Sequence, residues 1–140
     1  LWQTGDLEFS KYNHLESEKV RIVPFVNNMA DAYSISDLIV CRSGALTLAE
    51  ITVCGKPSIL IPFQFAAGDH QKKNAESLVS QNAAHILDEK TLTPKLLLYN
   101  IMNLIHNEDK LEKMGNSCSE LGKPFATNTI VDHILENHNQ

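Results

Sequence analysis

The sequence predicts an α/β domain in which helices cover both faces of a parallel sheet. Two observations support this fold class. Short apolar runs alternate along the chain with segments whose apolar residues recur at helical spacing. The runs are apolar throughout, as expected for strands that are buried on both faces. We therefore expect one Rossmann-like domain over residues 1–140, with any ligand at the carboxyl ends of the strands.

Four short apolar runs are expected to form the strands of this sheet. They cover residues 20–25, 37–41, 58–63 and 83–87. Pro24 and Pro62 end the first and third runs, because proline cannot donate a hydrogen bond to a neighbouring strand. Two polar loops, CRSGA and FQFAAGDHQ, follow the second and third strands at the end where such folds bind ligands.

The segments between and after these runs carry the helical pattern. We expect helices over residues 27–36, 44–54, 70–82, 94–107, 109–121 and 126–138. Asn27 or Asn28 can cap the first helix, and Gly55 ends the second in the usual left-handed position. Thr93 and Pro94 open the fourth helix. The last helices show apolar stripes with charged backs, which fits core packing or an interface with missing parts of a longer protein.

Composition excludes several classes of protein. The formal net charge of −5 argues against a general nucleic-acid binder, although backbone N–H groups can still bind a local anion. No apolar run approaches the length of a membrane-spanning helix, and the N-terminus has no secretory layout. The chain begins without Met, so it looks like a piece of a longer protein.

The cysteines and histidines give no sign of a metal site. Cys41, Cys54 and Cys118 are too few and too scattered for a zinc site or a disulfide framework. Cys41 and Cys54 lie in apolar runs and are expected to be reduced core residues. The histidines form no set with ligand spacing, so we expect neither a metal nor a cofactor.

The turn between the second strand and its helix allows two interpretations. In the first, it is an ordinary turn with Ser43 as the N-cap and Gly44 relieving a tight bend. In the second, it cradles a phosphorylated ligand. The free N–H groups of Ser43, Gly44 and Ala45 would then face an anion, and the helix dipole would attract it.

One face of the helix after this turn carries polar groups. Ser43, Thr47 and Glu50 recur at spacings of four and three, so they share a face. Thr47 can donate its hydroxyl to a phosphate, and Glu50 can accept two hydrogen bonds from a vicinal diol such as a ribose. Glu50 fits equally well as a first-turn acid that favours the helix dipole. The opposite residues are expected to face the sheet: Leu46, Ala49 and Val53.

The second loop offers amides and a carboxylate that suit a hydroxyl-rich ligand. Gln64, His70, Gln71 and Asn74 are the candidates, and Asp69 is equally explained as the N-cap of the next helix. His70 fits a structural role at least as well as a ligand contact. We find no serine, histidine and acid grouping that indicates a nucleophile with its base.

These residues resemble the MurG family of bacterial N-acetylglucosaminyltransferases, which complete the peptidoglycan precursor lipid II. The resemblance is carried by DLIVCRSGALTLAEITVCGKPSILIPF followed by DHQKKNAESL. It extends upstream to VPFVNNMADAYSISD and WQTG. It implies the C-terminal, donor-binding domain of a GT-B fold, bound to UDP-N-acetylglucosamine.

The resemblance also implies roles for individual residues. The backbone at Val26 would meet the uracil, and Glu50 would hold the ribose hydroxyls. Gln71 would contact the N-acetylglucosamine, while Arg42 and Ser43 shape the loop beside Gly44. The diphosphate would lie at the helix N-terminus, held by Ala45, Leu46 and Thr47. Gln64, His70 and Asn74 are further candidates, and no metal is implied.

The resemblance implies an inverting transfer to undecaprenyl-pyrophosphoryl-MurNAc-pentapeptide, part of cell-wall biogenesis, cell shape and division. The catalytic base, the lipid-linked acceptor site and peripheral membrane contact would belong to a missing N-terminal domain, so this chain would hold no catalytic residue. The protein would act at the cytoplasmic face of the bacterial inner membrane, and the isolated domain would be cytoplasmic. Two alternatives stay open: the donor domain or subunit of another GT-B UDP-sugar glycosyltransferase, and a non-catalytic sugar-nucleotide-binding module.

Overall fold

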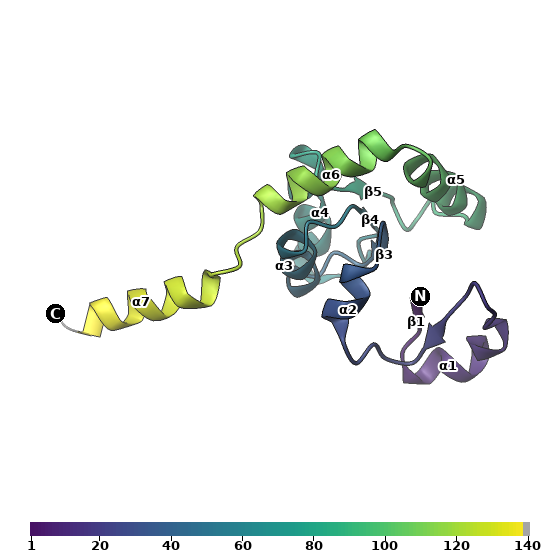
Figure 1. The fold of residues 1–140 in the computed structure, drawn as a ribbon, viewed down its shortest axis with the longest axis horizontal. Coiled ribbons are helices and arrows are strands. Elements are labelled where there is room, and N and C mark those ends of the chain that lie inside the picture. The colour runs from purple at the N-terminus through teal and green to yellow at the C-terminus, as the bar shows by residue number, and fades with distance from the viewer. Residues whose placement is uncertain (139–140) are drawn as a thin grey trace. The chain divides into compact units, whose positions relative to one another are not determined.

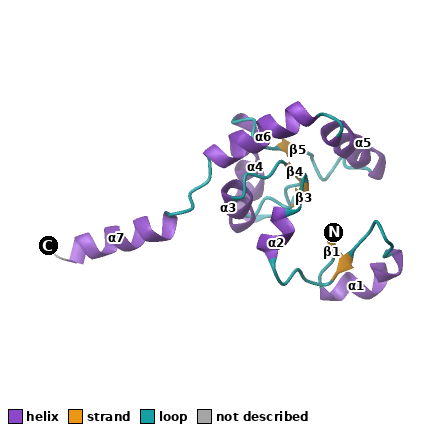
Figure 2. Cartoon of the chain, in the orientation of Figure 1, coloured by secondary structure: helices purple, strands orange, loops and turns teal. Residues whose placement is uncertain are grey.

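Parallel strands form the centre of each of the two compact units into which the chain divides, Leu1–Ser36 and Asp37–Gln140 (Figure 1). The structure is a computed structural model that describes residues 1–138. Each unit is described by itself. Figure 2 shows that the strands are short and that helices and loops account for most of the chain.

The first unit is a small βαβ arrangement followed by a helix. Its elements are β1 (Trp2–Gln3), α1 (Asp6–Tyr12), η1 (Asn13–Leu15), β2 (Ile22–Val23) and α2 (Met29–Ser34). β1 and β2 pair in parallel, with Trp2 opposite Ile22. The sequence predicted β2 and α2, and the Asn28 side chain caps α2 by accepting the Asp31 N–H at 3.3 Å. Neither β1 nor α1 was predicted from the sequence.

The second unit holds a three-stranded parallel sheet in the order β3-β4-β5. Its strands are β3 (Ile39–Cys41), β4 (Ser58–Leu60) and β5 (His85–Ile86). Its helices are α3 (Ala45–Val53), η2 (Ala67–Asp69), α4 (His70–Ser80), α5 (Pro94–Ile105), α6 (Glu108–Glu120) and α7 (Ala126–His138). Helices cover both faces of the parallel sheet, which confirms the predicted fold class. Because the strands are parallel, their carboxyl ends meet at one edge.

The core of the second unit forms around β4. Ile59, Leu87, Leu104 and Met114 are buried together, so α5 and α6 pack over the strand that lies in the middle of the sheet. Thr93 caps α5 by accepting the Leu96 N–H at 3.1 Å, as predicted. Of the strand predicted over residues 58–63, the structure forms Ser58–Leu60, and all three of these residues are buried.

Glycines allow α3 and α6 to approach each other closely. Gly55 ends α3 with φ 61°, the predicted left-handed position, and a Cβ there would overlap the Ser119 hydroxyl on α6. A Cβ on Gly115 would lie 3.0 Å from the carbonyl oxygen of Gly55. The buried Cys118 thiol lies 3.6 Å from the Ile51 carbonyl, in the same contact. The back of α3 is therefore held by backbone-to-backbone packing.

Four expectations about burial are wrong. Leu46 and Val53 are 75% and 48% exposed, Ala49 is exposed as well, and α3 instead turns Leu48, Ile51 and Thr52 inward. The error arose because α3 is apolar on most of its surface, so spacing alone did not select the buried face. β3 is an edge strand in this sheet, which leaves Val40 exposed rather than buried.

Cys54 and α7 also differ from the predictions. Cys54 is exposed at the C-cap of α3, so it is not a core residue, whereas Cys41 is partly buried. The apolar side chains of α7 that the structure describes are exposed rather than packed in a core: Ile130, Val131, Ile134 and Leu135. The other interpretation of this stripe, an interface with a missing part of a longer protein, stays a prediction.

We expect Gly122→Ala to destabilise the second unit. A Cβ at this position would lie 2.8 Å from the backbone oxygen of Thr52, which cannot rotate away. Overpacking of this kind costs about 1–3 kcal/mol. Urea denaturation should show the loss of unfolding free energy. The exposed Glu120→Ala serves as the control and should stay within about 0.5 kcal/mol of the wild type. Equal stability of Gly122→Ala and wild type would contradict the close packing.

Candidate functional site

The N-terminus of α3 opens at the carboxyl edge of the sheet, immediately after β3. Gly44 is the N-cap, with φ −65° and ψ 146°, so the prediction of Ser43 as the N-cap is wrong. No side chain caps the helix. The first N–H groups of a helix have no partner inside it, and here Ala45 and Leu46 are exposed. The arrangement leaves backbone donors and the positive end of the helix dipole open to a ligand.

Ser43 ties this turn to α4. It is fully buried, and its hydroxyl donates to the Gln71 carbonyl oxygen at 2.8 Å. The Asn74 side-chain amide donates back to the Ser43 carbonyl oxygen at 3.2 Å. Ser43 and Asn74 therefore lie close together, as do Ser43 and Gln71. The Ser43 hydroxyl is used within the protein, which gives this serine a structural task in the site.

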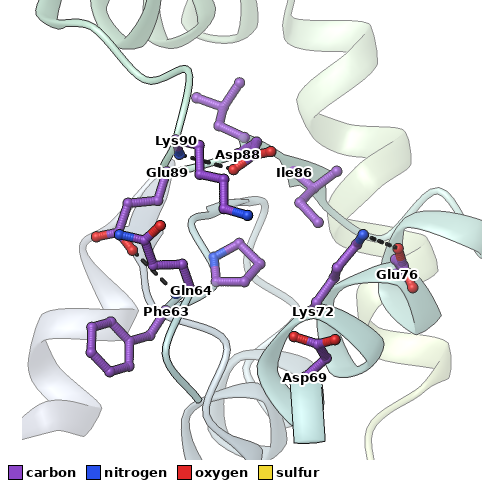
Figure 3. A pocket seen from close by; sticks show the side chains of 11 residues that line it. Phe63, Gln64, Asp69, Lys72, Glu76, Ile86, Asp88, Glu89 and Lys90 are labelled. Atoms are coloured by element: carbon purple, nitrogen blue, oxygen red, sulfur yellow. Dashed lines mark hydrogen bonds and ion pairs between the residues drawn. The ribbon is translucent and has the colours of Figure 1, made fainter. Parts of the chain in front are cut away.

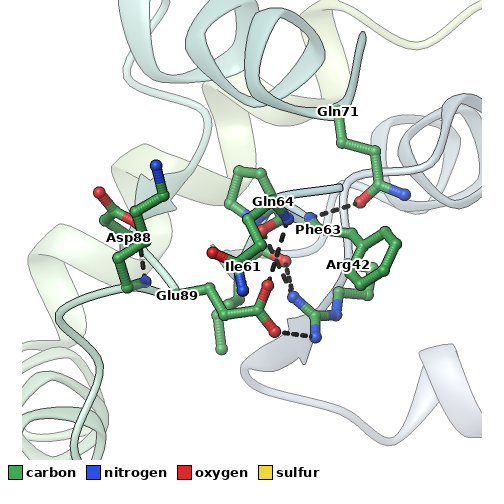
Figure 4. A network of polar contacts seen from close by, with 9 residues as sticks. Arg42, Ile61, Phe63, Gln64, Gln71, Asp88 and Glu89 are labelled. Atoms are coloured by element: carbon green, nitrogen blue, oxygen red, sulfur yellow. Dashed lines mark hydrogen bonds and ion pairs between the residues drawn. The ribbon is translucent and has the colours of Figure 1, made fainter. Parts of the chain in front are cut away.

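Arg42 connects the turn to two further loops at the same edge (Figure 4). Its Nη1 donates to the carbonyl oxygens of Ile61 at 3.1 Å and Pro62 at 3.3 Å. Its Nη2 pairs with a carboxylate oxygen of Glu89, just beyond β5. The guanidinium also lies 5.4 Å from the centre of the Phe63 ring, within cation–π range. One side chain thus joins the segments that follow β3, β4 and β5.

Glu89 completes this link with its second oxygen. Oε2 accepts the Gln64 backbone N–H at 3.2 Å. The Arg42 guanidinium lowers the pKa of the Glu89 carboxyl below its ordinary value, and the Gln64 N–H lowers it further. The carboxylate therefore stays charged, and the contact would weaken only when acidification protonates it at a pH below the usual range for glutamate.

Gln71, the predicted sugar contact, is held by the segment after β4. The Phe63 backbone N–H donates to Gln71 Oε1 at 3.0 Å. The side chain of Gln71 therefore uses its oxygen inside the protein. This leaves the amide NH₂ group, which can only donate, for a ligand.

A cavity of about 470 Å³ lies beside this network, between the ends of β4 and β5 (Figure 3). One wall comes from Phe63 and Gln64, and the facing wall comes from Asp69, Lys72 and Glu76. Lys72 pairs with Glu76 at 3.9 Å. Asp88, Glu89 and Lys90 line a further side. The lining is strongly charged and mixed in sign.

The remaining candidates of the second loop have distinct surroundings. Gln64 lines the cavity and is held through its backbone by Glu89. His70 starts α4, and its ring lies over Gly68. Asp69 occupies the N-cap position of α4 but makes no side-chain cap bond and has φ 55°. The expectation that it acts as an ordinary cap is therefore wrong, because its left-handed backbone turns the carboxylate away from the helix amides.

Val26, the predicted uracil contact, belongs to the first unit. Its backbone N–H donates to Gln3 Oε1 at 2.8 Å, a contact between the loop after β2 and the end of β1. Gln3 and Val26 are 23 residues apart in the chain. The role of Val26 toward a nucleotide stays a prediction.

The described residues offer no ready metal site, and the cysteine beside Arg42 is not an activated thiol. Within residues 1–138, no group of three His, Cys, Asp or Glu side chains converges in a way that could hold a metal ion. Burial raises the pKa of the Cys41 thiol, next to Arg42, to about 11, so it stays protonated at neutral pH.

A membrane span needs a long and strongly apolar helix. Residues 1–138, which the structure describes, contain no helix of that kind.

Residues 1–130 match the glycosyltransferase family 28 C-terminal domain. The chain belongs to this family. It is 38% identical over 138 residues to a protein of Chlorobium limicola and 44% identical over 136 residues to one of Geobacter sulfurreducens. Both are named UDP-N-acetylglucosamine--N-acetylmuramyl-(pentapeptide) pyrophosphoryl-undecaprenol N-acetylglucosamine transferase. These matches cover 97% and 95% of this chain but only 38% and 37% of the relatives.

A solved structure has the same fold as this family 28 domain. The crystal structure of Acinetobacter baumannii MurG matches with a TM-score of 0.85 and 32% identity. The match covers 96% of this chain and 40% of that one. The glycosyltransferase VinC, solved in complex with dTDP, matches with a TM-score of 0.68 at 19% identity, which shows the fold alone. The predicted family resemblance is confirmed.

Sequence reasoning missed Glu89 in this family 28 domain. It lies 47 residues from Arg42, so no local spacing connects the two. The one available signal was its place directly after an apolar strand. Residues that follow the carboxyl ends of parallel strands share an edge, so the argument that placed the CRSGA loop at the ligand-binding end applies to Glu89 as well.

Two fully buried serines allow the tie between the turn and α4 to be tested. Ser43 donates a hydrogen bond to Gln71, whereas the Ser58 hydroxyl has no partner among the described residues. We expect Ser43→Ala to lower the unfolding free energy by about 0.5–1.5 kcal/mol, measured by urea denaturation. Ser58→Ala should be neutral or stabilising, because it removes an unsatisfied buried hydroxyl. Equal losses in both variants would show that the Ser43 bond contributes nothing.

Proposed function

We propose that this chain is the donor-binding part of an inverting glycosyltransferase. In this proposal the enzyme transfers N-acetylglucosamine from UDP-N-acetylglucosamine to undecaprenyl-pyrophosphoryl-MurNAc-pentapeptide. The observation that carries the proposal is the open N-terminus of α3, uncapped at Gly44, at the carboxyl edge of the sheet. The name carried by relatives 38–44% identical to this chain supports the choice of substrate.

The chain's own residues supply donor binding and leaving-group stabilisation in this mechanism. The backbone N–H groups of Ala45, Leu46 and Thr47 face the diphosphate at the start of α3. When the acceptor hydroxyl attacks the anomeric carbon, the bond to the β-phosphate oxygen breaks and UDP leaves with the bonding electrons. The helix N-terminus stabilises the charge that develops there, without a metal ion.

Other residues fix the donor's position. Glu50 lies in the second turn of α3, not in its first, and accepts hydrogen bonds from the ribose hydroxyls. Gln71 donates its NH₂ group to the sugar, and the backbone at Val26 meets the uracil. Holding the donor in one orientation aligns the anomeric carbon for attack opposite the diphosphate.

The rest of the reaction is assigned to protein outside this chain. The chain spans about 38% of the length of the curated relatives that it matches. We assign the base that takes the acceptor proton, the lipid-linked acceptor site and the membrane contact to that other part. The proposal places the whole enzyme at the cytoplasmic face of the bacterial inner membrane.

We expect the chain to bind UDP but not ADP, and Glu50→Ala to weaken UDP binding by about 1–3 kcal/mol, the scale of a lost charged hydrogen-bond set. Isothermal titration calorimetry measures both. Glu112→Ala, which removes an exposed carboxylate on α6, is the matched control and should bind UDP like the wild type. Unchanged UDP affinity in Glu50→Ala would remove this carboxylate from the site.

We also expect the chain alone to transfer no sugar, because the base lies outside it in this proposal. The assay mixes the chain with labelled UDP-N-acetylglucosamine and the lipid-linked acceptor, and a full-length relative of the same family is the positive control. Transfer of label to the lipid fraction by the wild-type chain, together with its loss in Glu50→Ala, would overturn the assignment of the base to protein outside this chain.

A further inference from the structure

We propose that Glu89 is a positioning residue for the donor sugar, acting through the segment after β4 on the side chain of Gln71. The inference rests on the proposed function for the identity of the ligand, a UDP-linked hexose. It adds a residue that lies outside both predicted loops and is held in place by contacts within the second unit alone.

The first step is the grip of Glu89 on the segment after β4. One carboxylate oxygen pairs with Arg42, whose Nη1 in turn holds the carbonyl oxygens of Ile61 and Pro62. The other oxygen accepts the Gln64 N–H at 3.2 Å. Glu89 therefore holds the chain on both sides of Phe63. It accepts directly from Gln64, and through Arg42 it holds Ile61 and Pro62. The Phe63 ring lies beside the same guanidinium.

The second step leads from Phe63 to Gln71. With its neighbours held on both sides, Phe63 directs its N–H at Gln71 Oε1 over 3.0 Å (Figure 4). An N–H donor accepts only one orientation of the amide, because the reverse orientation would set two donors against each other. Phe63 therefore selects the amide orientation in which the Gln71 oxygen faces the Phe63 N–H and the NH₂ group points away from it.

The third step is the consequence for recognition. The NH₂ group of Gln71 can donate to a hydroxyl or carbonyl oxygen of the sugar and cannot accept from it. The Ser43 hydroxyl holds the Gln71 backbone at 2.8 Å, so backbone and side chain are fixed from different loops. Removing Glu89 frees the segment after β4 and releases the side chain of Gln71, while the N-terminus of α3 keeps its own supports. Sugar recognition should suffer more than UDP recognition.

The test compares the affinities of UDP and UDP-N-acetylglucosamine by calorimetry. In Glu89→Ala we expect the ratio of the two dissociation constants to shift against the sugar nucleotide by about 3- to 10-fold, the worth of one hydrogen bond. UDP affinity should stay within about twofold, a change well below one hydrogen bond. Glu89→Gln keeps an acceptor oxygen and should show a smaller shift. Asp88→Asn is the control. Among the described residues, this neighbouring carboxylate accepts a hydrogen bond only from the Lys90 backbone N–H.

A double variant tests the route through Gln71. If Glu89 acts through this amide, Glu89→Ala should shift the ratio no further in a Gln71→Ala background. A full additional shift would overturn the proposal. An unchanged ratio in Glu89→Ala would also overturn it. An equal loss of affinity for both ligands would overturn it too, because that result indicates a structural role only.

Amide hydrogen exchange separates this inference from the proposed function, because it needs no ligand. In Glu89→Ala we expect faster exchange at the N–H groups of Phe63 and Gln64, measured by NMR, with unchanged exchange in Asp88→Asn. Unchanged exchange in Glu89→Ala overturns the positioning role whatever the chain binds. If the wild-type chain binds neither nucleotide, the proposed function fails, and the assignment of Glu89 to a donor sugar fails with it. Faster exchange in Glu89→Ala would then show only that Glu89 holds the segment around Phe63 in place.

Discussion

The contact between Arg42 and Glu89 is the constraint on which the sheet edge depends. The segment after β4 runs through Pro62 and leaves the backbone of the sheet, so the carbonyl oxygens of Ile61 and Pro62 need a donor from elsewhere. A guanidinium offers five N–H groups in a fixed plane and meets both carbonyls while it pairs with a carboxylate. A lysine at this position would bring its three N–H donors on one nitrogen and could not span the same partners in a plane. The pair thereby joins the segments after β4 and β5 to Arg42, while the turn before α3 is also held to α4 through Ser43.

The site is supported from behind as well as from the edge. Strands of two or three residues give little rigidity by themselves, so the position of α3 depends on its neighbours. Glycine contacts fix its far side against α6, and the buried Ser43 fixes the turn before it against α4. Buried polar groups that are fully bonded specify one arrangement, whereas an apolar contact alone tolerates sliding. The exposed start of α3 is thus the open end of a firmly held helix.

Sequence reasoning recovered the elements of this second unit because apolar strands and capped helices leave strong local patterns. Gly55 and Thr93 were assigned correctly, and Asn28 was one of two predicted caps, since each of these roles depends on a few neighbouring residues. The buried face of α3 was predicted wrongly, because a helix rich in apolar residues gives periodicity little to select. Glu89 was missed for a different reason. Its partners come from two other strand ends, and only the order of the strands brings them together.

The uncapped start of α3 has a thermodynamic consequence. Most helices satisfy their first amides with a serine, threonine, aspartate or asparagine, but Gly44 has no side chain to offer. In the proposed complex the diphosphate takes the place of that missing cap. The substrate then becomes part of the helix's own hydrogen bonding, which water supplies to the exposed amides in the empty protein. Occupancy and conformational stability are linked in such a design, so each turnover that releases UDP also loosens the element that held it.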